Sequence, residues 1–331
     1  MAKTILGVDI GYDNLKLALV SGENVKKTVS VPMPKNMIRD GQVVSVESVG
    51  EMIRSTMKEH GLRAGNAALA LPNESVFVKS VALPVMTADQ LEYNLPFEFR
   101  DYITGEIRDY SFDYAMYEKS GPATEGEEEK LEMFAAGAPK TVIDDARQMM
   151  RKAGLKLAIA APAVSAYMQL IRRRIATRKE QGKEYCILDL GYQAVRMYIF
   201  RGERLIVTRI LDVGLSGLDE VLAEACSVDV HLAHTYLMTD YEHCTRRDEC
   251  MNAYAGIATE LTRALNFYRF SSPEGNLEDI WLTGGGVKIA PLTESLSDSL
   301  DLQIHPAAEL LPDSTLPDAE SFIQAIGITM Q

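Results

Sequence analysis

The chain has 331 residues, of which 47% are hydrophobic and 24% charged, so its bulk is that of a folded globular protein and not of a disordered one. Its net charge of −13, from 34 basic and 47 acidic residues, argues against binding to duplex nucleic acid or to an anionic membrane surface. No apolar run is long enough to span a bilayer, the start lacks the pattern of a signal peptide, and four cysteines without a CxxC pair do not make a disulfide framework. We therefore expect a cytoplasmic protein of two or three domains, or one large two-lobed unit.

Strand and helix patterns alternate along the chain. Residues 1–31 have the pattern of strands, and apolar residues at helical spacing before Gly61 predict a helix over 45–60. Thr87 and Gln90 have the spacing of a capping box at the start of a helix. Further helices are predicted over residues 140–153, 163–182, 217–226, 230–239 and 253–271, and residues 314–331 are predicted to end in a helix.

A segment near the start of the chain is repeated 180 residues later without a gap. Residues 8–23, VDIGYDNLKLALVSGE, align with residues 188–203, LDLGYQAVRMYIFRGE. The two segments share an Asp-x-Gly-Tyr sequence, a second Gly-Glu turn and apolar residues at alternate positions between them. Each copy predicts a β-hairpin, and so long a period indicates two similar domains in one chain.

The turn of each hairpin has the chemistry of a phosphate site. Backbone N–H groups at a glycine turn can face an anion, and Lys16 lies just beyond the first turn. Asp9 and Asp189 end the strands before the turns and can hold Mg²⁺ through water. One such hairpin is explained equally well as a common structural turn, but the second copy favours two hairpins that clamp a polyphosphate.

A third element follows near the end of the chain. Residues 278–292, EDIWLTGGGVKIAPL, combine a short apolar strand, three glycines and the start of a helix. Three consecutive glycines let a backbone pass close to a flat ligand such as a purine ring. The alternative is an ordinary turn from strand to helix, for which one glycine would suffice.

Two Asp-x-Gly hairpins followed by a strand, glycines and a helix resemble the actin-like ATPase superfamily, which includes FtsA. Within it, LPFEFRDYI, GLSGLDEVLAEAC and ATELTRALNFYRF follow in an order and spacing similar to those of the PilM family of type IV pilus assembly proteins. The resemblance implies an α/β, actin-like (ribonuclease H-like) fold of two lobes, with an inserted α+β subdomain in the first lobe. The first lobe is expected over residues 1–165, its insertion over about 80–158, and the second lobe over 166–331.

The resemblance also implies that ATP or ADP binds with Mg²⁺ in a cleft between the lobes. Asp9 and Asp189 would hold the Mg²⁺ through water. The residues expected to bind the nucleotide come from the two hairpin turns, two helices and the glycine segment: Gly11, Tyr12, Asp13, Asn14, Lys16, Gly191, Tyr192, Gln193, Gly214, His234, Gly284, Gly285 and Gly286.

Some of these positions depart from the family pattern. The family usually has small hydroxyl residues where Tyr12, Asp13 and Asn14 stand, and an Ala-Glu-x-x-Lys helix where His234 and Leu237 stand. Asp13 puts a negative charge beside the expected phosphates, and no catalytic carboxylate can be assigned. We therefore expect ATP binding with slow or absent hydrolysis.

The function implied by the resemblance is that of a cytoplasmic scaffold in a type IV pilus or related secretion machine, held at the inner face of the membrane by its partners. The inserted subdomain would capture the cytoplasmic tail of a PilN-like membrane protein, with Phe97, Phe99 and Tyr102 as candidate linings. Other inner-membrane components of the pilus are further candidates, and nucleic acid is not expected. The alternatives are an actin-like ATPase or filament-forming protein, which would turn ATP over and self-associate, and a pseudo-ATPase with an empty cleft.

Two further clusters have plainer explanations. Three cysteines and three histidines fall between Cys226 and Cys250, and zinc would suit such ligands. They show no CxxC spacing, so buried thiols and surface histidines are favoured. The basic run RRRIATRK, residues 172–179, is better explained by cations at a helix end than by contact with lipid headgroups.

Overall fold

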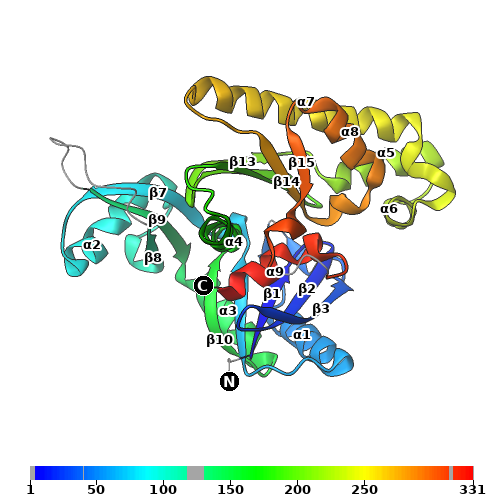
Figure 1. Ribbon diagram of the computed structural model, residues 1–331. Helices are drawn as coiled ribbons and strands as arrows, with labels where there is room; N and C mark the ends of the chain where they lie inside the picture. Colours follow the sequence, from blue (N-terminus) through cyan, green and yellow to red (C-terminus); the bar gives the residue numbers. More distant parts are fainter. Residues whose placement is uncertain (1–3, 40, 118–129, 313–315, 331) are drawn as a thin grey trace. The chain divides into compact units, whose positions relative to one another are not determined.

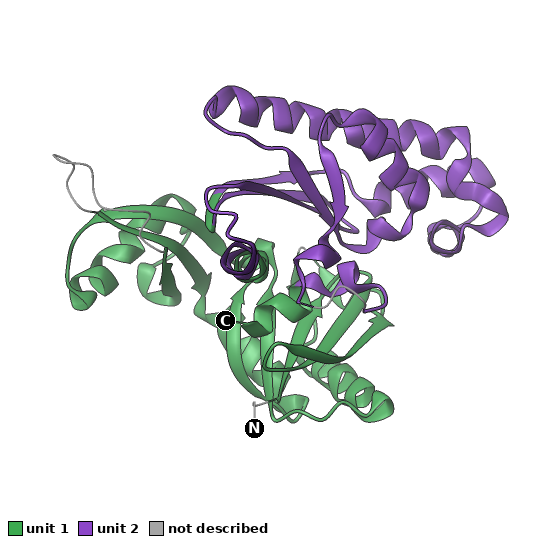
Figure 2. Ribbon diagram, viewed as in Figure 1, with its two compact units in different colours: residues 1–170, 203–205, 324–331 green, residues 171–202, 206–323 purple. Residues whose placement is uncertain are grey.

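The contacts of the chain divide it into two compact units (Figure 2). The computed structural model describes residues 4–39, 41–117, 130–312 and 316–330. Unit 1 contains residues 1–170, 203–205 and 324–331, and unit 2 contains residues 171–202 and 206–323. Each unit has a hydrophobic core of its own, as a domain does.

Unit 1 is built on a five-stranded sheet in which three parallel strands are followed by two antiparallel ones (Figure 1). The strands are, in spatial order, β10 (Lys156–Pro162), β6 (Asn66–Leu71), β1 (Thr4–Ile10), β2 (Asn14–Ser21) and β3 (Asn24–Pro32). The first predicted hairpin is confirmed as β1–β2, in which Asp9 is paired with Lys16. A two-stranded ribbon follows, formed by β4 (Ile38–Arg39) and β5 (Gln42–Val43).

Two helices cover one face of this sheet. α1 (Val46–His60) begins at Ser45, whose side chain accepts a hydrogen bond from the N–H of Ser48, and ends at Gly61, where φ is 68°. α3 (Lys140–Lys152) packs beside α1, and both helices share one apolar cluster with the strands. The helices predicted over residues 45–60 and 140–153 are thereby confirmed as α1 and α3.

On the opposite face of the sheet, β6 contributes small residues. Ala68 and Ala70 alternate along β6 with residues that face the α1–α3 cluster, as the two-residue period of a strand requires. They pack against Ala166 of α4 (Ala163–Arg178), which begins in unit 1 and ends in unit 2. Such small side chains let the helix backbone approach the sheet closely.

The end of the chain returns to this same face. A Cβ built on Gly7 would lie 1.7 Å from the carbonyl oxygen of Ala325, so the two backbones are in direct contact. This contact explains why residues 324–331, which the sequence assigns to the second lobe, group with unit 1. The segment 314–331 is predicted to end in a helix, and among the described residues there α9 (Ile323–Gly327) is α-helical, with 3₁₀ turns on either side.

An inserted subdomain forms a separate antiparallel sheet within unit 1. Its strands are, in spatial order, β7 (Phe77–Pro84), β9 (Lys130–Pro139) and β8 (Tyr110–Met116). α2 (Ala88–Asn94) starts with the predicted capping box, in which Thr87 and Gln90 exchange two hydrogen bonds. The sequence extends the insertion to residue 158, but α3 and β10 join the main sheet and its core, so the insertion ends near Pro139.

The short turn at residues 203–205 also belongs to unit 1. The hydroxyl of Ser80 on β7 donates a 2.6 Å hydrogen bond to the carbonyl of Leu205, and it lies 2.7 Å from the hydroxyl of Tyr117. Arg204 forms an ion pair with Glu132 on β9. These contacts fasten the turn to the inserted subdomain.

Unit 2 repeats the main sheet of unit 1 strand for strand. Its strands are, in spatial order, β13 (Arg204–Leu211), β12 (Val195–Arg201), β11 (Glu184–Leu190), β14 (Asp279–Thr283) and β15 (Gln303–Pro306). β11 pairs antiparallel with β12 and parallel with β14, just as β1 pairs with β2 and β6. The repeat in the sequence therefore corresponds to a repeated α/β layer.

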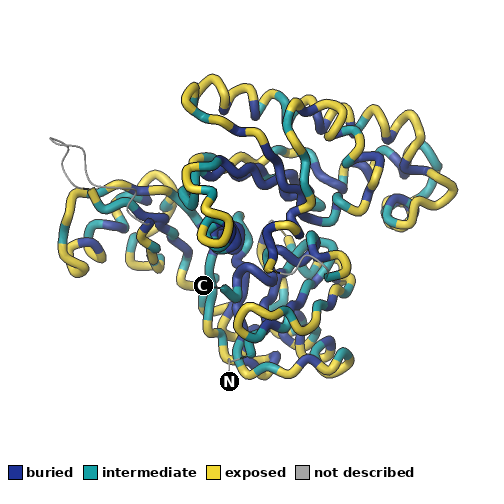
Figure 3. Tube along the Cα trace, in the orientation of Figure 1, coloured by how far each residue is buried: buried dark blue, intermediate teal, exposed yellow. Residues whose placement is uncertain are grey.

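Helices of unit 2 share one large apolar cluster with its sheet, in which the inner strands β11, β12 and β14 are largely buried (Figure 3). They are α5 (Leu215–Cys226), α6 (Val230–Thr239), α7 (Asp248–Ser271) and α8 (Ala290–Ser299). None of the helices in the described part of the chain has the length and apolar content needed to cross a membrane.

Replacing Gly7 by alanine should destabilise unit 1, because the new methyl group would overlap the Ala325 carbonyl and displace the end of the chain. Overpacking of this kind costs about 1–3 kcal/mol, so the urea midpoint followed by circular dichroism should fall. Gly65→Ala is the matched control, since a Cβ at Gly65 meets no atom within 4 Å and should leave the midpoint unchanged. Equal midpoints for the two variants would contradict this packing.

Candidate functional site

The first hairpin turn is closed tightly between β1 and β2. The N–H of Gly11 donates to the carbonyl of Asn14 at 3.0 Å, and a Cβ on Gly11 would lie 3.1 Å from that oxygen. The N–H of Met33, just after β3, donates to the carbonyl of Asp13 at 2.8 Å. The turn is therefore held from both sides, so its backbone has a defined shape for a ligand.

Both carboxylates of this turn have partners. Asp9 is 8% exposed, and its carboxylate lies 3.6 Å from the Nζ of Lys16. Asp13 accepts a 2.5 Å hydrogen bond from the side-chain amide of Asn14. The distance between Lys16 and Asp9 exceeds that of a charge-assisted hydrogen bond, and an ammonium has three donors, so this pair leaves Lys16 able to meet a phosphate.

Tyr12 fixes a neighbouring loop. Its hydroxyl accepts a 2.5 Å hydrogen bond from the N–H of Gly41, a residue with a φ of 75° at the tip of the β4–β5 ribbon. A small hydroxyl residue at position 12 could not reach so far. The departure from the family pattern at this position thus has a structural role in unit 1.

The corresponding turn in unit 2 packs against the start of α5. The N–H groups of Leu215 and Ser216 donate to the carbonyls of Gly191 and Tyr192 at 3.2 and 2.8 Å. A Cβ on Gly214 would lie only 2.4 Å from the Tyr192 carbonyl. The first N–H groups of α5, which a helix leaves without internal partners, are therefore used to hold the turn.

The glycine segment, residues 284–286, packs tightly against the end of β11. Gly284 has a φ of 94°, and a Cβ there would lie 2.6 Å from both the Oδ1 of Asp189 and the carbonyl of Leu190. A Cβ on Gly286 would lie 2.8 Å from the Cβ of Leu190, whereas Gly285 has more room beside α5. Two of the three glycines are thus required by close packing against β11, and they bring the segment to the second turn.

His234 is linked to the same turn through Tyr192. The two rings meet edge to face with their centroids 5.6 Å apart, and the Nδ1 of His234 lies 2.9 Å from the carboxylate of Asp219. Asp219 is fully buried on α5. Sequence reasoning missed Asp219, although an acidic residue inside the apolar run LSGLDEVLA was an available signal.

The predicted site residues form one cluster in each unit. The unit 1 cluster contains Asp9, Gly11, Tyr12, Asp13, Asn14 and Lys16. The unit 2 cluster contains Asp189, Gly191, Tyr192, Gln193, Gly214, His234, Gly284, Gly285 and Gly286. Gln193 lies at the tip of its turn and is exposed.

The two clusters share a charge pattern at their strand ends. Asp9 faces Lys16 across β1 and β2, and Asp189 faces Arg196 across β11 and β12 in the same register. Each strand end therefore combines a largely buried carboxylate with a basic residue. Among the described residues no three His, Cys, Asp or Glu side chains are placed to hold a metal ion directly.

The cysteines of unit 2 have the environment of structural thiols. Cys244 is buried, and its thiol donates to the carbonyl of Tyr236 at 3.3 Å. Burial raises the pKa of Cys244 to about 11, so its thiol is neutral at physiological pH. His243 is exposed to solvent.

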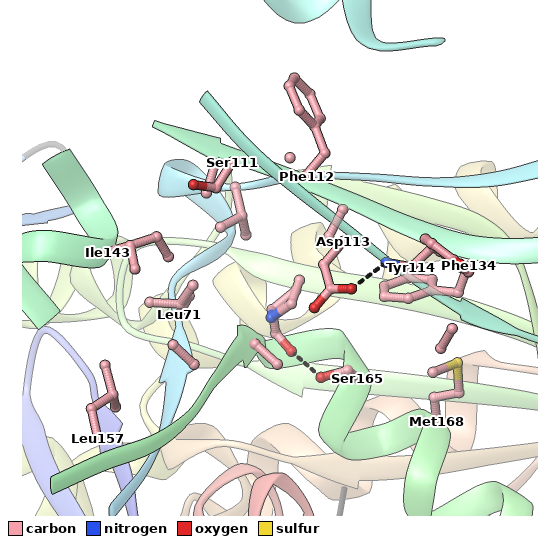
Figure 4. A pocket seen from close by; sticks show the side chains of 18 of the residues that line it. Leu71, Ser111, Phe112, Asp113, Tyr114, Phe134, Ile143, Leu157, Ser165 and Met168 are labelled. Carbon is pink, nitrogen blue, oxygen red and sulfur yellow. Dashed lines mark hydrogen bonds between the residues drawn. The ribbon is translucent and has the colours of Figure 1, made fainter. Parts of the chain in front are cut away.

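A cavity of about 370 Å³ lies in unit 1 beside the inserted subdomain (Figure 4). Five consecutive residues of β8, Ser111–Ala115, and most of β10 line it, so both strands turn an edge toward it. β8 and β10 are the outermost strands of their respective sheets. The remaining lining is mainly apolar and includes Leu71, Val76, Phe134, Ile143, Leu157 and Met168.

The three aromatic residues suggested from the sequence do not line this cavity. Phe99 is fully buried in the subdomain core, where its ring lies 5.5 Å from that of Phe112. The ring of Tyr102 lies 5.6 Å from that of Phe77, and Phe97 is partly exposed. The sequence could not reveal the true lining, because its residues come from segments that only the fold brings together.

A family model described as type IV pilus assembly protein PilM matches residues 7–321 of the chain. The chain belongs to the PilM family. The structure of this family member is similar to a solved PilM-PilN type IV pilus biogenesis complex, with a TM-score of 0.80 and 24% identity over 98% of this chain and 97% of that one.

More distant relatives share the fold of this PilM-family protein. The ethanolamine utilization protein EutJ from Carboxydothermus hydrogenoformans has a TM-score of 0.60 and 13% identity, over 100% of this chain and 89% of that one. MreB 5 of Spiroplasma citri bound to AMPPNP has a TM-score of 0.55 and 11% identity, over 99% of this chain and 96% of that one. The actin-like fold predicted from the sequence is thereby confirmed.

Gly214→Ala should loosen the second turn of this PilM-family protein, because the added methyl group would collide with the Tyr192 carbonyl. We expect a lower thermal midpoint and faster hydrogen exchange in residues 191–195. Gly217→Ala, on the next turn of α5, meets no atom within 4 Å and exchanges a helical glycine for alanine, which gains up to about 1 kcal/mol. A similar loss of stability in both variants would show that the contact at position 214 does not hold the turn.

Proposed function

We propose that this PilM-family protein is a scaffold of type IV pilus assembly that captures the cytoplasmic tail of a PilN-like membrane partner in the cavity between β8 and β10. It binds ATP or ADP with Mg²⁺ through its two glycine turns. Its partner holds it at the inner face of the cytoplasmic membrane. The observation that carries the proposal is the pair of outermost strands whose edges face one cavity.

An extended peptide is the ligand that suits two strand edges. An edge strand carries unpaired N–H and C=O groups, and a tail in extended conformation can add to it as a further strand. Here β8 belongs to the inserted subdomain and β10 to the main sheet. A tail in this cavity would therefore bridge the subdomain and the core of unit 1.

The side chains of the cavity favour a tail with alternating apolar residues. Leu71, Ile143 and Met168 form an apolar floor, onto which every second side chain of an extended peptide could point. Asp113 of β8 lines the cavity (Figure 4). Arg147 on α3 is also part of its lining. Arg147 is paired with Asp144 on the surface, and such an exposed pair is weak enough to be exchanged for a carboxylate of the tail.

The solved relative supports the identity of the partner. It is a complex of PilM with PilN, and its fold matches this chain over almost its whole length. A PilN-like tail is therefore the first ligand to test in the cavity.

Filling the cavity should block the tail. We expect Ala160→Trp, on β10, to weaken binding of a synthetic PilN-like tail peptide at least about tenfold, a change of about 1.4 kcal/mol, in fluorescence anisotropy. Ala176→Trp on the exposed surface of α4 is the control and should bind as wild type does. Equal affinities for a correctly folded Ala160→Trp protein and the control would refute this site.

Nucleotide binding rests on the two clusters of glycine turns and carboxylates. Lys16 and the backbone of residues 11–15 would contact the phosphates, while Asp9 and Asp189 would hold Mg²⁺ through water. The Mg²⁺ would offset phosphate charge beside Asp13. The relative MreB 5 was solved with AMPPNP, which supports a nucleotide as a ligand of this fold.

The residues of the first turn suit a nucleotide that is bound but not hydrolysed. Hydrolysis needs a group that orients or deprotonates water. Asp13 could be a base, but its carboxylate is bonded to the Asn14 amide, and its charge would oppose a phosphate. A scaffold needs no turnover, because a bound nucleotide can select one conformation by its differential affinity alone.

Lys16→Ala should weaken Mg-ATP binding on the order of 10- to 100-fold in calorimetry, because a charged hydrogen-bond donor to the phosphates is lost. Lys35→Ala, which removes an exposed lysine beyond β3, should leave the affinity unchanged. Unaltered affinity in Lys16→Ala would remove this lysine from the site. Phosphate release by the wild type should stay far below the enzyme median of about 10 per second, and fast release abolished by Asp13→Ala would instead favour an actin-like ATPase.

A further inference from the structure

One end of unit 1 gathers segments that are far apart in the chain. Because β1, β6 and β10 are parallel, their first residues lie at the same edge of the sheet, and α1 and α3 must end there to lead into β6 and β10 (Figure 1). Two hydrogen bonds tie this end together. The N–H of Lys156 donates to the carbonyl of Gly65 at 3.0 Å, and the Nζ of Lys27 donates to the carbonyl of His60 at 2.7 Å.

Exposed cations are concentrated at this end, which we call the basic pole. The basic pole consists of Lys26, Lys27, Lys58, Arg63, Arg151, Lys152 and Lys156, all of them exposed. Nearby carboxylates are Glu23 and Glu59, together with Glu51, which is paired with Lys152 at 2.9 Å. A protein whose net charge is −13 thus carries a locally positive surface.

A β-bulge adds to this surface. β2 and β3 pair Leu19 with Lys27 and Val20 with Val25, so Lys26 is an extra residue without an opposite partner. Such a bulge bends the edge strand and lets two successive residues reach solvent. Lys26 and Lys27 are both exposed for this reason.

Helix capping explains only part of the basic pole. Lys58, Arg151 and Lys152 stand in the last turns of α1 and α3, where cations complement the helix dipole. Lys26 and Lys156 lie on strands, and Arg63 lies on a loop, so these three cations have no such explanation.

We propose that the basic pole of unit 1 rests on an anionic lipid surface. Seven exposed lysines and arginines lie within the range of four to eight that is typical of segments held by anionic headgroups. They come from the β2–β3 hairpin, α1, the loop after it, α3 and β10, so they form a broad surface and not a groove. A broad array of flexible lysines matches a plane of headgroups better than it matches an acidic peptide, which needs a groove and directed hydrogen bonds.

This inference does not depend on nucleotide binding or on the cavity between β8 and β10. The negative net charge of the rest of the chain would repel the same membrane, so only this end would approach it. The electrostatic field of the protein would thereby favour one orientation, with the basic pole facing the membrane.

Vesicle sedimentation tests the proposal on the full chain. Wild type should bind vesicles that contain phosphatidylglycerol, should prefer them to pure phosphatidylcholine, and should lose this preference at high salt. The triple variant Lys26→Glu, Lys58→Glu, Lys156→Glu should bind anionic vesicles at least about tenfold more weakly. The matched control changes three exposed lysines at other ends of unit 1 by the same charge: Lys35→Glu, Lys130→Glu and Lys140→Glu.

The control triple should keep most of the wild-type affinity, and circular dichroism should find both triples folded. Equal losses in the two triples would mean that only net charge matters, and the proposal would be overturned. The same holds if wild type shows no preference for anionic vesicles. If the first triple binds vesicles like wild type but loses binding to immobilised polyglutamate, the basic pole is a site for an acidic polypeptide and the lipid assignment is wrong.

Discussion

The parallel run of β10, β6 and β1 determines where every surface of unit 1 lies. Since the three strands run in one direction, all their amino ends share one edge of the sheet and all their carboxyl ends share the other. The turn with Asp9 and Gly11 follows a carboxyl end, where α/β sheets usually bind ligands. The basic pole lies at the amino ends, and the cavity between β8 and β10 lies along β10, the outermost strand of the sheet. One topological constraint thus separates the three surfaces.

The tyrosines of the two turns have structural partners. Tyr12 holds Gly41, and Tyr192 meets His234, which in turn is bonded to buried Asp219. Each such hydrogen bond stabilises the fold by about 1 kcal/mol and restrains a turn. Both turns therefore have a defined backbone shape.

The cavity between β8 and β10 forms where the outermost strands of two sheets of unit 1 meet. Exposed strand edges invite aggregation, and proteins normally cover or charge them. Here the edges of β8 and β10 face a common cavity, with Asp113 on one side and Arg147 on the other. The insertion supplies β8, the outermost strand of its sheet, to one side of this cavity.

The sequence by itself determined what depends on neighbours along the chain. The capping box at Thr87, the Asp-x-Gly hairpins and their repetition follow from hydrogen bonds within a few residues and from side-chain periodicity, and the repetition predicted two similar domains. The actin-like fold itself was implied by the resemblance of these segments to a known superfamily. Only the tertiary structure decided which distant groups meet. It put the last residues of the chain against Gly7, paired Asp219 with His234, and gathered the cavity lining and the basic pole. Composition averages charge over the whole chain, whereas folding sorts charges in space, so a net charge of −13 could not reveal a positive surface around Lys156.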